Sequence, residues 1–276
     1  MAIPAHSILI TGASSGYGAA LAEVYARPGV ALWLGARNES RLAAVASLCR
    51  ARGAEVATRC VDVTDRDVMA GWIGECHRIR PLDLVIANAG ISAGTGGIAK
   101  DGGIEAPHQA QRIVAVNIDG VLNTVEPAIP LMRCREPRPG IVSRAARGQI
   151  AIVASLAAFR GFPGAPAYSA SKAAVKTWGE ALRPILARDG IAVSVVCPGF
   201  VATPMTAHND FPMPFLMTAD AAARRTRAGL DRGPARIAFP WPMYVAAWLL
   251  GALPPAISDR LLAGTPGKGP FNEGAR

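Results

Sequence analysis

Short apolar runs alternate with longer helical runs along most of the chain, and this alternation constrains the fold more than any other feature. Near-continuous apolar strands separated by helices are typical of a parallel sheet that is covered on both faces and joined by right-handed crossovers. The sequence therefore predicts an α/β fold with a doubly wound parallel sheet. The expected strands are 7–11, 30–35, 55–60, 82–88, 148–155, 191–197 and 235–240, and the expected helices include 16–27, 39–52, 65–79 and 107–132.

The composition fits one folded domain. The 276 residues are 51% hydrophobic and 18% charged, which supplies a sizeable core and is too little charge for a disordered chain. Glycine and proline are spread along the chain instead of gathering in one linker. We therefore expect a single domain over 1–276, with a substrate lid around 200–233, an apolar extension over 237–276 and a surface insertion of unknown purpose over 134–148.

The net charge of +9 comes mainly from arginine. A nucleic-acid-binding protein gathers its basic residues and interleaves them with aromatic residues. Here the basic residues are scattered and aromatic residues make up only 6%, so we expect no nucleic-acid partner. A solvated basic surface is the simplest interpretation, and attraction to an anionic ligand or an acidic membrane surface stays open.

The five cysteines form no CxxC pair, and their number is odd. Each lies in or beside an apolar or helical run, so we expect buried, reduced thiols in a cytoplasmic protein. A strand within the first dozen residues argues against a signal peptide. The cysteines are Cys49, Cys60, Cys76, Cys134 and Cys197. The four histidines are too dispersed to indicate a metal site; they are His6, His77, His108 and His208.

The stretch "TGASSGYG" at 11–18 lies between the first expected strand and the first expected helix. Its glycines, Gly12, Gly16 and Gly18, leave room for backbone N–H groups to approach a phosphate, and the helix N-terminus adds partial positive charge. A turn that needs glycine only for left-handed geometry is the alternative. At the start of an alternating α/β chain, this turn indicates a dinucleotide site in a Rossmann-type sheet.

The second expected strand ends in "LGARN" at 34–38. An acidic residue here would hold the ribose hydroxyls of NAD, and none occurs before Glu39. Arg37 instead offers a guanidinium suited to a 2′-phosphate. We therefore expect NADP as the cofactor in preference to NAD; a solvated arginine at a strand end is the alternative.

The stretch "YSASK" places Tyr168 and Lys172 four residues apart, on one face of an expected helix. An unperturbed phenol has a pKa of roughly 10 and is a poor base at neutral pH. A nearby lysine cation is expected to lower that pKa toward the range in which proton transfer is efficient. Ser155, at the end of the preceding strand, is placed to hydrogen-bond a substrate oxygen. The same spacing is also common on solvated helix faces, so the pair alone does not indicate an active site.

In that context, residues 7–205 resemble the short-chain dehydrogenase/reductase family. "TGASSGYG" is similar to the family's glycine motif, "NAG" to its motif after the fourth strand, and "CPGFVAT" to the segment that lines the nicotinamide. "VNIDG" contains Asn117 where the family keeps a proton-relay asparagine, and "DVTD" contains Asp62 where it contacts adenine. Each motif is weak alone, but their order and spacing together are specific.

The resemblance implies an NADP-dependent oxidoreductase that moves a hydride between the nicotinamide and a ketone or secondary alcohol. It implies that Tyr168 exchanges the proton, Ser155 orients the oxygen and Lys172 binds the ribose and lowers the pKa of Tyr168. Asn117 would hold a water that links Lys172 to bulk solvent. The implied cofactor-binding residues are Gly12, Ser14, Ser15, Gly16, Tyr17, Gly18, Arg37, Asp62, Val63, Asn88, Ala89, Gly90, Tyr168, Lys172, Pro198, Gly199, Val201 and Thr203.

Residues 200–223 are rich in Phe, Met and Pro. An apolar wall here indicates a small hydrophobic alcohol or carbonyl substrate, and a lid that packs without touching substrate is an equal alternative. Residues 237–258 carry no charge, but four prolines interrupt them, so a spanning helix is not expected. This segment is expected to be a subunit interface or pocket cover, or to make peripheral contact with a membrane surface.

Two alternatives to an enzyme are a catalytically weak, NADP(H)-binding redox sensor and a membrane-surface regulatory protein. The set formed by Asn117, Ser155, Tyr168 and Lys172 argues against the sensor, because a sensor needs no proton relay. Family members often form dimers or tetramers through the helices around 107–132 and 166–188. The resemblance therefore implies a homodimer or homotetramer.

Overall fold

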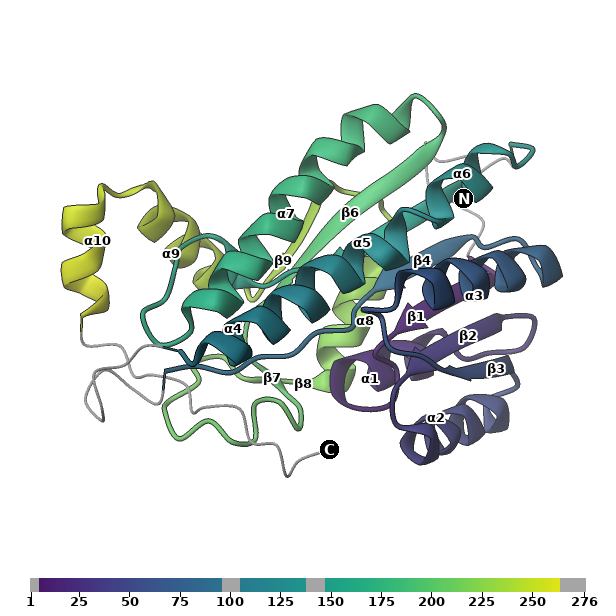
Figure 1. Cartoon of the computed structure of the whole chain (residues 1–276), viewed down its shortest axis with the longest axis horizontal. Helices are drawn as coiled ribbons and strands as arrows, with labels where there is room; N and C mark the ends of the chain where they lie inside the picture. Colours follow the sequence, from purple (N-terminus) through teal and green to yellow (C-terminus); the bar gives the residue numbers. More distant parts are fainter. Residues whose placement is uncertain (1–4, 96–104, 138–146, 264–276) are drawn as a thin grey trace.

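The computed structural model describes residues 5–95, 105–137 and 147–263, and Figure 1 shows their arrangement. Seven strands in this part of the chain form a parallel sheet in the order β3-β2-β1-β4-β5-β6-β9. The chain starts in the middle, winds to one edge, crosses back and winds to the other, which confirms the doubly wound α/β fold. The strands are β1 (Ser7–Thr11), β2 (Ala31–Ala36), β3 (Glu55–Cys60), β4 (Leu84–Ala87), β5 (Gly148–Val153), β6 (Ile191–Pro198) and β9 (Arg236–Phe239).

Helices lie on both faces of the sheet (Figure 1). The α-helices of the described residues are α1 (Gly16–Tyr25), α2 (Glu39–Ala51), α3 (Arg66–Ile79), α4 (Pro107–Val114), α5 (Gly120–Val125), α6 (Ala128–Arg133), α7 (Pro166–Ala187), α8 (Ala219–Leu230), α9 (Trp241–Ala252) and α10 (Pro255–Leu262). The last two, α9 and α10, lie at one end of the molecule (Figure 1). A short parallel pair, β7 (Val201–Ala202) and β8 (Met217–Thr218), lies outside the main sheet.

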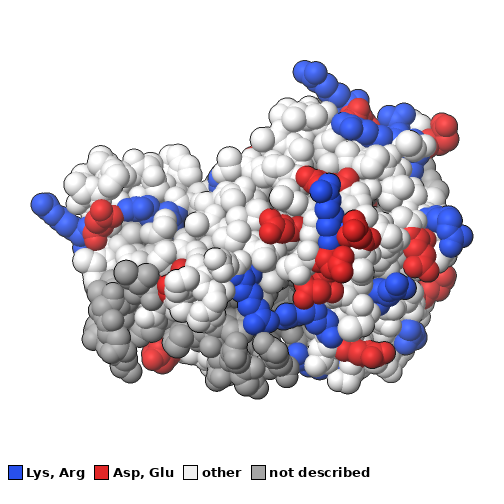
Figure 2. Space-filling model, viewed as in Figure 1, with Lys and Arg blue, Asp and Glu red and all other residues white. Residues whose placement is uncertain are grey.

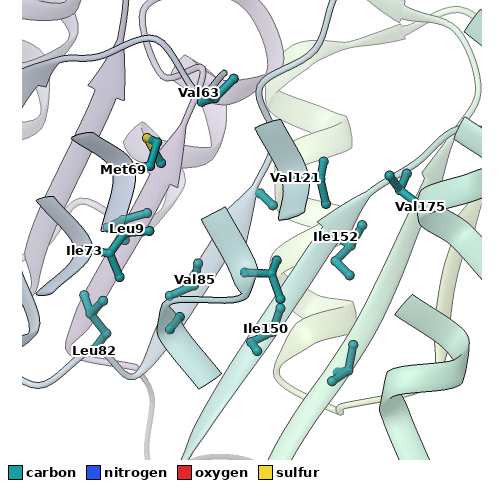
Figure 3. Close-up of a cluster of buried hydrophobic side chains, with 14 of the residues drawn as sticks. Leu9, Val63, Met69, Ile73, Leu82, Val85, Val121, Ile150, Ile152 and Val175 are labelled. Carbon is teal, nitrogen blue, oxygen red and sulfur yellow. The ribbon is translucent and has the colours of Figure 1, made fainter. Parts of the chain in front are cut away.

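Successive residues of β1 pack into opposite layers, as the alternation of side chains along a strand requires. Leu9 belongs to the apolar cluster shared with α3, α5 and α7, part of which Figure 3 shows. Ile8 and Ile10 belong to the cluster shared with α1, α2 and α8. Burial of the sheet on both faces explains why the strands are almost continuously apolar.

The expected helix over 107–132 is not regular. A turn of π-helix over Ala115–Asp119 separates α4 from α5, and it contains Asn117, which is fully buried. Single π-turns inside α-helices are rare and are frequent at functional sites. The hydrophobic pattern predicts the helix but not this turn, because one extra residue hardly changes the apolar face.

The expectation of buried thiols is wrong for two of the cysteines. Cys49, Cys76 and Cys197 are buried, whereas Cys60 and Cys134 are exposed, and all five are free. Cys60 ends β3, an edge strand whose side chains mostly face solvent. Cys134 follows the last residue of α6. Position at an edge or a helix end therefore overrides the local apolar pattern.

The expected insertion over 134–148 lies partly outside the described residues. At its described start, Arg135 is buried, not on the surface, and its Nη2 donates to Asp83 Oδ1 at 2.8 Å. Loss of either partner would leave a buried charge unpaired, so this ion pair fixes the approach of the chain to β4.

The segment after β6 divides into two parts. Residues 200–218 run past the carboxyl ends of the strands, whereas α8 packs against α1, with a hydrogen bond between the hydroxyls of Tyr17 and Thr226. The uncharged segment over 237–258 contains all of α9 and the start of α10. In the described part of the chain, no helix combines the length and apolarity needed to cross a membrane.

Candidate active site

A cleft of about 730 Å³ opens at the carboxyl ends of the strands. It lies where β1 and β4 are neighbours, the point at which the strand order reverses and at which open α/β sheets bind ligands. All the residues expected to bind a cofactor line this cleft, and Ser155 lines it as well. Asn117 is not in the lining.

The glycine turn is packed too tightly for side chains. A Cβ at Gly18 would lie 2.2 Å from the carbonyl oxygen of Gly12, and one at Gly12 would lie 2.8 Å from Ala89 Cα. Gly12 and Gly16 also have φ values of 68° and 54°. Asn88 closes the turn, because its Nδ2 donates to the carbonyl oxygen of Thr11 at 2.9 Å. The floor of the cleft is therefore backbone, as a phosphate-binding turn requires.

One end of the cleft is lined by two arginines. Arg37 Nη1 lies 4.0 Å from Asp62 Oδ2, and the two side chains are 51% and 43% exposed, so this contact is weak. Arg41 also lines the cleft and was not predicted. Asn38 caps α2 by accepting a hydrogen bond of 2.9 Å from the Arg41 backbone N–H, which places Arg41 in the first turn beside Arg37. This N-cap spacing was the sequence signal for Arg41.

Tyr168, Ser155 and Lys172 meet at the other end. The Tyr168 and Ser155 side chains are hydrogen-bonded. Ser155 Oγ also accepts a hydrogen bond of 3.1 Å from the Ala157 backbone N–H. Lys172 Nζ lies 5.9 Å from the centre of the Tyr168 ring and donates to the carbonyl oxygen of Val153 at 3.0 Å. Helix α7 thus brings Tyr168 and Lys172 to the end of β5.

The structure reverses the expected pKa shift of Tyr168. Burial raises the pKa of the Tyr168 phenol, and the hydrogen bond with Ser155 only partly opposes this. Burial also lowers the pKa of Lys172 to about 8, with Cys197 acting in the opposite direction. The amine is directed to the Val153 carbonyl and is itself desolvated, so it does not offset the burial of the phenol.

Asn117 supports the cleft from behind. Its Oδ1 accepts from the Ile91 backbone N–H at 2.8 Å, and its Nδ2 donates to the Ile91 carbonyl oxygen at 2.9 Å and to Ser171 Oγ at 3.0 Å. A Cβ at Gly90 would lie 3.2 Å from both Asn117 Oδ1 and Lys172 Nζ. The Asn117 amide is therefore committed to holding residues 88–91 against α7.

The lid contributes less apolar surface than expected. Phe200 and Phe211 pack against each other with ring centroids 6.1 Å apart, and Phe215 is 59% exposed. These aromatic residues are not in the lining, because they pack within the segment itself or face solvent. The lining residues that were not predicted are Ala36, Asn38, Arg41, Val61, Ile91, Ser92, Arg112, Val116, Val153, Ala154, Pro204, Met205, Thr206, His208 and Asn209. Most of these residues lie next to a motif that the sequence analysis identified. No sequence feature indicated Arg112.

Across the ranges 5–95, 105–137 and 147–263, no three His, Cys, Asp or Glu residues are grouped to hold a metal ion. Residues 6–211 match the family model described as short chain dehydrogenase. The chain belongs to this family. Its Rossmann-type fold, its glycine turn and its Tyr168–Lys172 pair now have one common explanation.

Relatives of this short-chain dehydrogenase are oxidoreductases. An uncharacterized oxidoreductase of Myxococcus xanthus is 38% identical over 259 residues, which cover 91% of this chain and 94% of the relative. A 3-dehydrosphinganine reductase of Arabidopsis thaliana is 34% identical over 198 residues, 71% of this chain and 55% of the relative. A solved short-chain dehydrogenase of Sphingobium yanoikuyae in complex with NADPH has a TM-score of 0.73 at 25% identity, covering 95% and 96% of the two chains. This protein is an oxidoreductase of the dehydrogenase/reductase kind.

Proposed function

We propose that this enzyme reduces a carbonyl compound with NADPH, using Tyr168 as the proton donor. The observation that carries the proposal is that Tyr168, Ser155 and Lys172 line the same cleft as the glycine turn. A bound nicotinamide supplies the hydride, and the protein supplies position and electrostatics. The sites at which a Cβ would collide, Gly12 and Gly18, fit a pyrophosphate held by backbone N–H groups.

Burial favours Tyr168 as an acid. A phenol whose pKa is raised stays neutral at physiological pH and carries the proton that a reduced carbonyl oxygen needs. Ser155, already hydrogen-bonded to Tyr168, would orient that oxygen through the same hydroxyl. Lys172 would bind the nicotinamide ribose, and its cationic form would stabilise the phenolate left after proton transfer. Asn117 would hold the loop over residues 88–91 beside this amine, and a water bound there would link the amine to bulk solvent.

The preference for NADP rests on charge. Arg37 and Arg41 line the cleft where β2 ends, and no carboxylate ends that strand. Guanidinium groups bind a 2′-phosphate, whereas a carboxylate there would bind the ribose hydroxyls of NAD. The Sphingobium yanoikuyae structure contains NADPH, whereas a related structure from Mycobacterium paratuberculosis contains NAD. Because these structures differ in cofactor, the proposed preference for NADP rests on Arg37 and Arg41 alone.

The substrate that we propose has a hydrophobic body and a polar group beside the carbonyl. Ile91, Val116 and Met205 give the cleft apolar surface. Asn209 Oδ1 is buried without a hydrogen-bond partner among the described residues, and Asn209 lines the cleft. Rotation of the Asn209 side chain would bring this oxygen into the cleft, where an O–H or N–H group of the substrate would satisfy it. A homodimer or homotetramer in the cytoplasm, with its thiols reduced, completes the proposal.

The test follows the absorbance of NADPH against a panel of hydrophobic ketones, with and without a hydroxyl or amine next to the carbonyl. The panel includes 3-dehydrosphinganine, the compound in the name of the Arabidopsis thaliana relative. Consumption of NADPH that depends on the ketone supports the proposal. Tight NADPH binding without consumption for any member would instead support the redox-sensor alternative.

A further inference from the structure

We propose that α9 and α10 dock onto the surface of an anionic lipid bilayer. The two helices form a lobe at one end of the molecule (Figure 1). The lobe carries large apolar side chains that are 37% to 70% exposed, and we call this set the apolar face. Its residues are Trp241, Val245, Trp248, Leu249, Leu253, Ile257 and Leu261. This inference concerns attachment, and it does not rest on the proposed reaction.

The apolar face follows from helical spacing. On α9, residues 241, 245, 248 and 249 share one side, and the opposite side packs inward through Ala247, which is buried. Tyr244 reinforces the inward side, because its ring packs edge-on against Phe159 with centroids 5.4 Å apart. A helix whose inner side is satisfied in this way presents its outer apolar side without a partner among the described residues.

The chemistry of the face favours a bilayer over a second copy. A protein interface needs roughly one hydrogen bond per 100–200 Å², but the exposed side of α9 offers no charged side chain and, besides its indoles, no polar one. The apolar interior of a bilayer requires no such hydrogen bonds. Trp241 and Trp248 lie seven residues apart on the same side, and tryptophan favours the membrane–water boundary. Both helices are too short to cross a bilayer, so they would lie in the plane of its surface.

The charged residues of the lobe also favour an anionic bilayer as the partner. Figure 2 shows an uncharged cap on the lobe above a narrow band of charged atoms. Asp259 in α10 is paired with Arg160 Nη2 at 2.5 Å, which leaves Arg260 as the exposed cation beside Ile257 and Leu261. The net charge of +9 is attracted to anionic lipid.

The lobe also contacts Phe159 and Arg160, which lie close to the cleft in sequence. Arg160 donates to Ser258 Oγ at 3.1 Å, and a Cβ at Gly251 would lie 2.2 Å from the carbonyl oxygen of Phe159. Phe159 and Arg160 follow Ser155 by only a few residues. A surface that holds α9 and α10 therefore holds the segment beside the catalytic serine, and the cleft would lie near the bilayer.

The test is flotation with vesicles of phosphatidylglycerol and phosphatidylcholine, and with vesicles of phosphatidylcholine alone. The wild-type protein should float with the anionic vesicles and lose binding as salt is raised. Leu249→Asp should lower the partition coefficient at least ~10-fold, because it places a charge in the buried side of the contact. Leu48→Asp in α2 is the matched control: Leu48 is 53% exposed and Leu249 is 52% exposed, so flotation should not change.

A second measurement needs no variant. Acyl chains labelled with bromine should quench the fluorescence of the wild-type protein if Trp241 and Trp248 enter the boundary. Absence of both flotation and quenching would overturn the proposal, as would equal losses for Leu249→Asp and Leu48→Asp. A dimer in lipid-free solution that Leu249→Asp converts to a monomer, without vesicle binding, would assign the face to a second copy and overturn it as well.

Discussion

Glu105 Oε2 accepts a hydrogen bond of 2.8 Å from the backbone N–H of Ala167, the residue before Tyr168. The N-cap residue of α7, Ala165, has no side chain to cap the helix, and Glu105 performs this task from a distant segment. Its negative charge also suits the positive end of the helix dipole. The start of the helix that carries Tyr168 and Lys172 therefore depends on Glu105.

Glu105→Ala should lower the free energy of unfolding by ~1–2 kcal/mol, the usual cost of a lost cap. Glu105→Gln, which keeps an acceptor, should lose less. Burial raises the pKa of the Glu105 carboxyl, so the folded state holds its proton more tightly, and stability from this group is lost as pH rises through the folded pKa. Urea unfolding of both variants from pH 4 to 8 measures this; equal stability of Glu105→Ala and wild type would contradict it.

Tyr168→Phe should reduce turnover at least ~100-fold, because acid–base transfer contributes 10²–10⁴ to the rate, while NADPH still binds. Tyr25→Phe is a suitable control. Tyr25 is buried against the other face of the sheet, and its hydroxyl has no hydrogen-bond partner among the described residues. Steady-state rates and NADPH fluorescence titrations separate the two effects. Near-normal turnover by Tyr168→Phe would remove Tyr168 from the mechanism.

The two reaction directions should respond differently to pH. Reduction needs neutral Tyr168, which burial preserves, whereas oxidation needs its conjugate base and should accelerate as pH rises. The cation of Lys172 is present below its pKa of about 8 and is lost above it, so binding of NADPH should weaken there. Rates in both directions and the Kd for NADPH from pH 6 to 10 test this. Parallel profiles for the two directions would contradict it.

The sequence predicted the parts of the site that depend on local spacing. The glycine turn and the Tyr168–Lys172 pair are fixed by a few neighbouring residues, so their motifs placed them in the cleft. The pKa shift of Tyr168 was predicted with the wrong sign, because burial depends on the whole fold. The cap from Glu105 was missed for the same reason, because its partner Ala167 is far away in sequence. The π-turn at Asn117 was missed because one extra residue hardly changes the apolar face of the helix.

Glycines in two settings should respond oppositely to alanine. Gly18→Ala would place a Cβ 2.2 Å from the Gly12 carbonyl oxygen, so it should destabilise the glycine turn and weaken NADPH binding at least ~10-fold. Gly71→Ala in α3 has open space around it and should raise the free energy of unfolding by ~0.5–1 kcal/mol. Calorimetry and NADPH titration test the pair. Unchanged binding by Gly18→Ala would argue against a phosphate at this turn.

Arg37 and Arg41 should act together on the choice of cofactor. Each hydrogen bond between a guanidinium and a phosphate contributes about 1.5–3 kcal/mol, so Arg37→Ala or Arg41→Ala should raise the KM for NADPH roughly 10–100-fold. The KM for NADH should barely change, because NADH has no 2′-phosphate. Arg78→Ala, an exposed site on α3 outside the cleft lining, is the control. If the wild-type enzyme prefers NADH, or if the double variant keeps its preference for NADPH, these arginines do not read the phosphate.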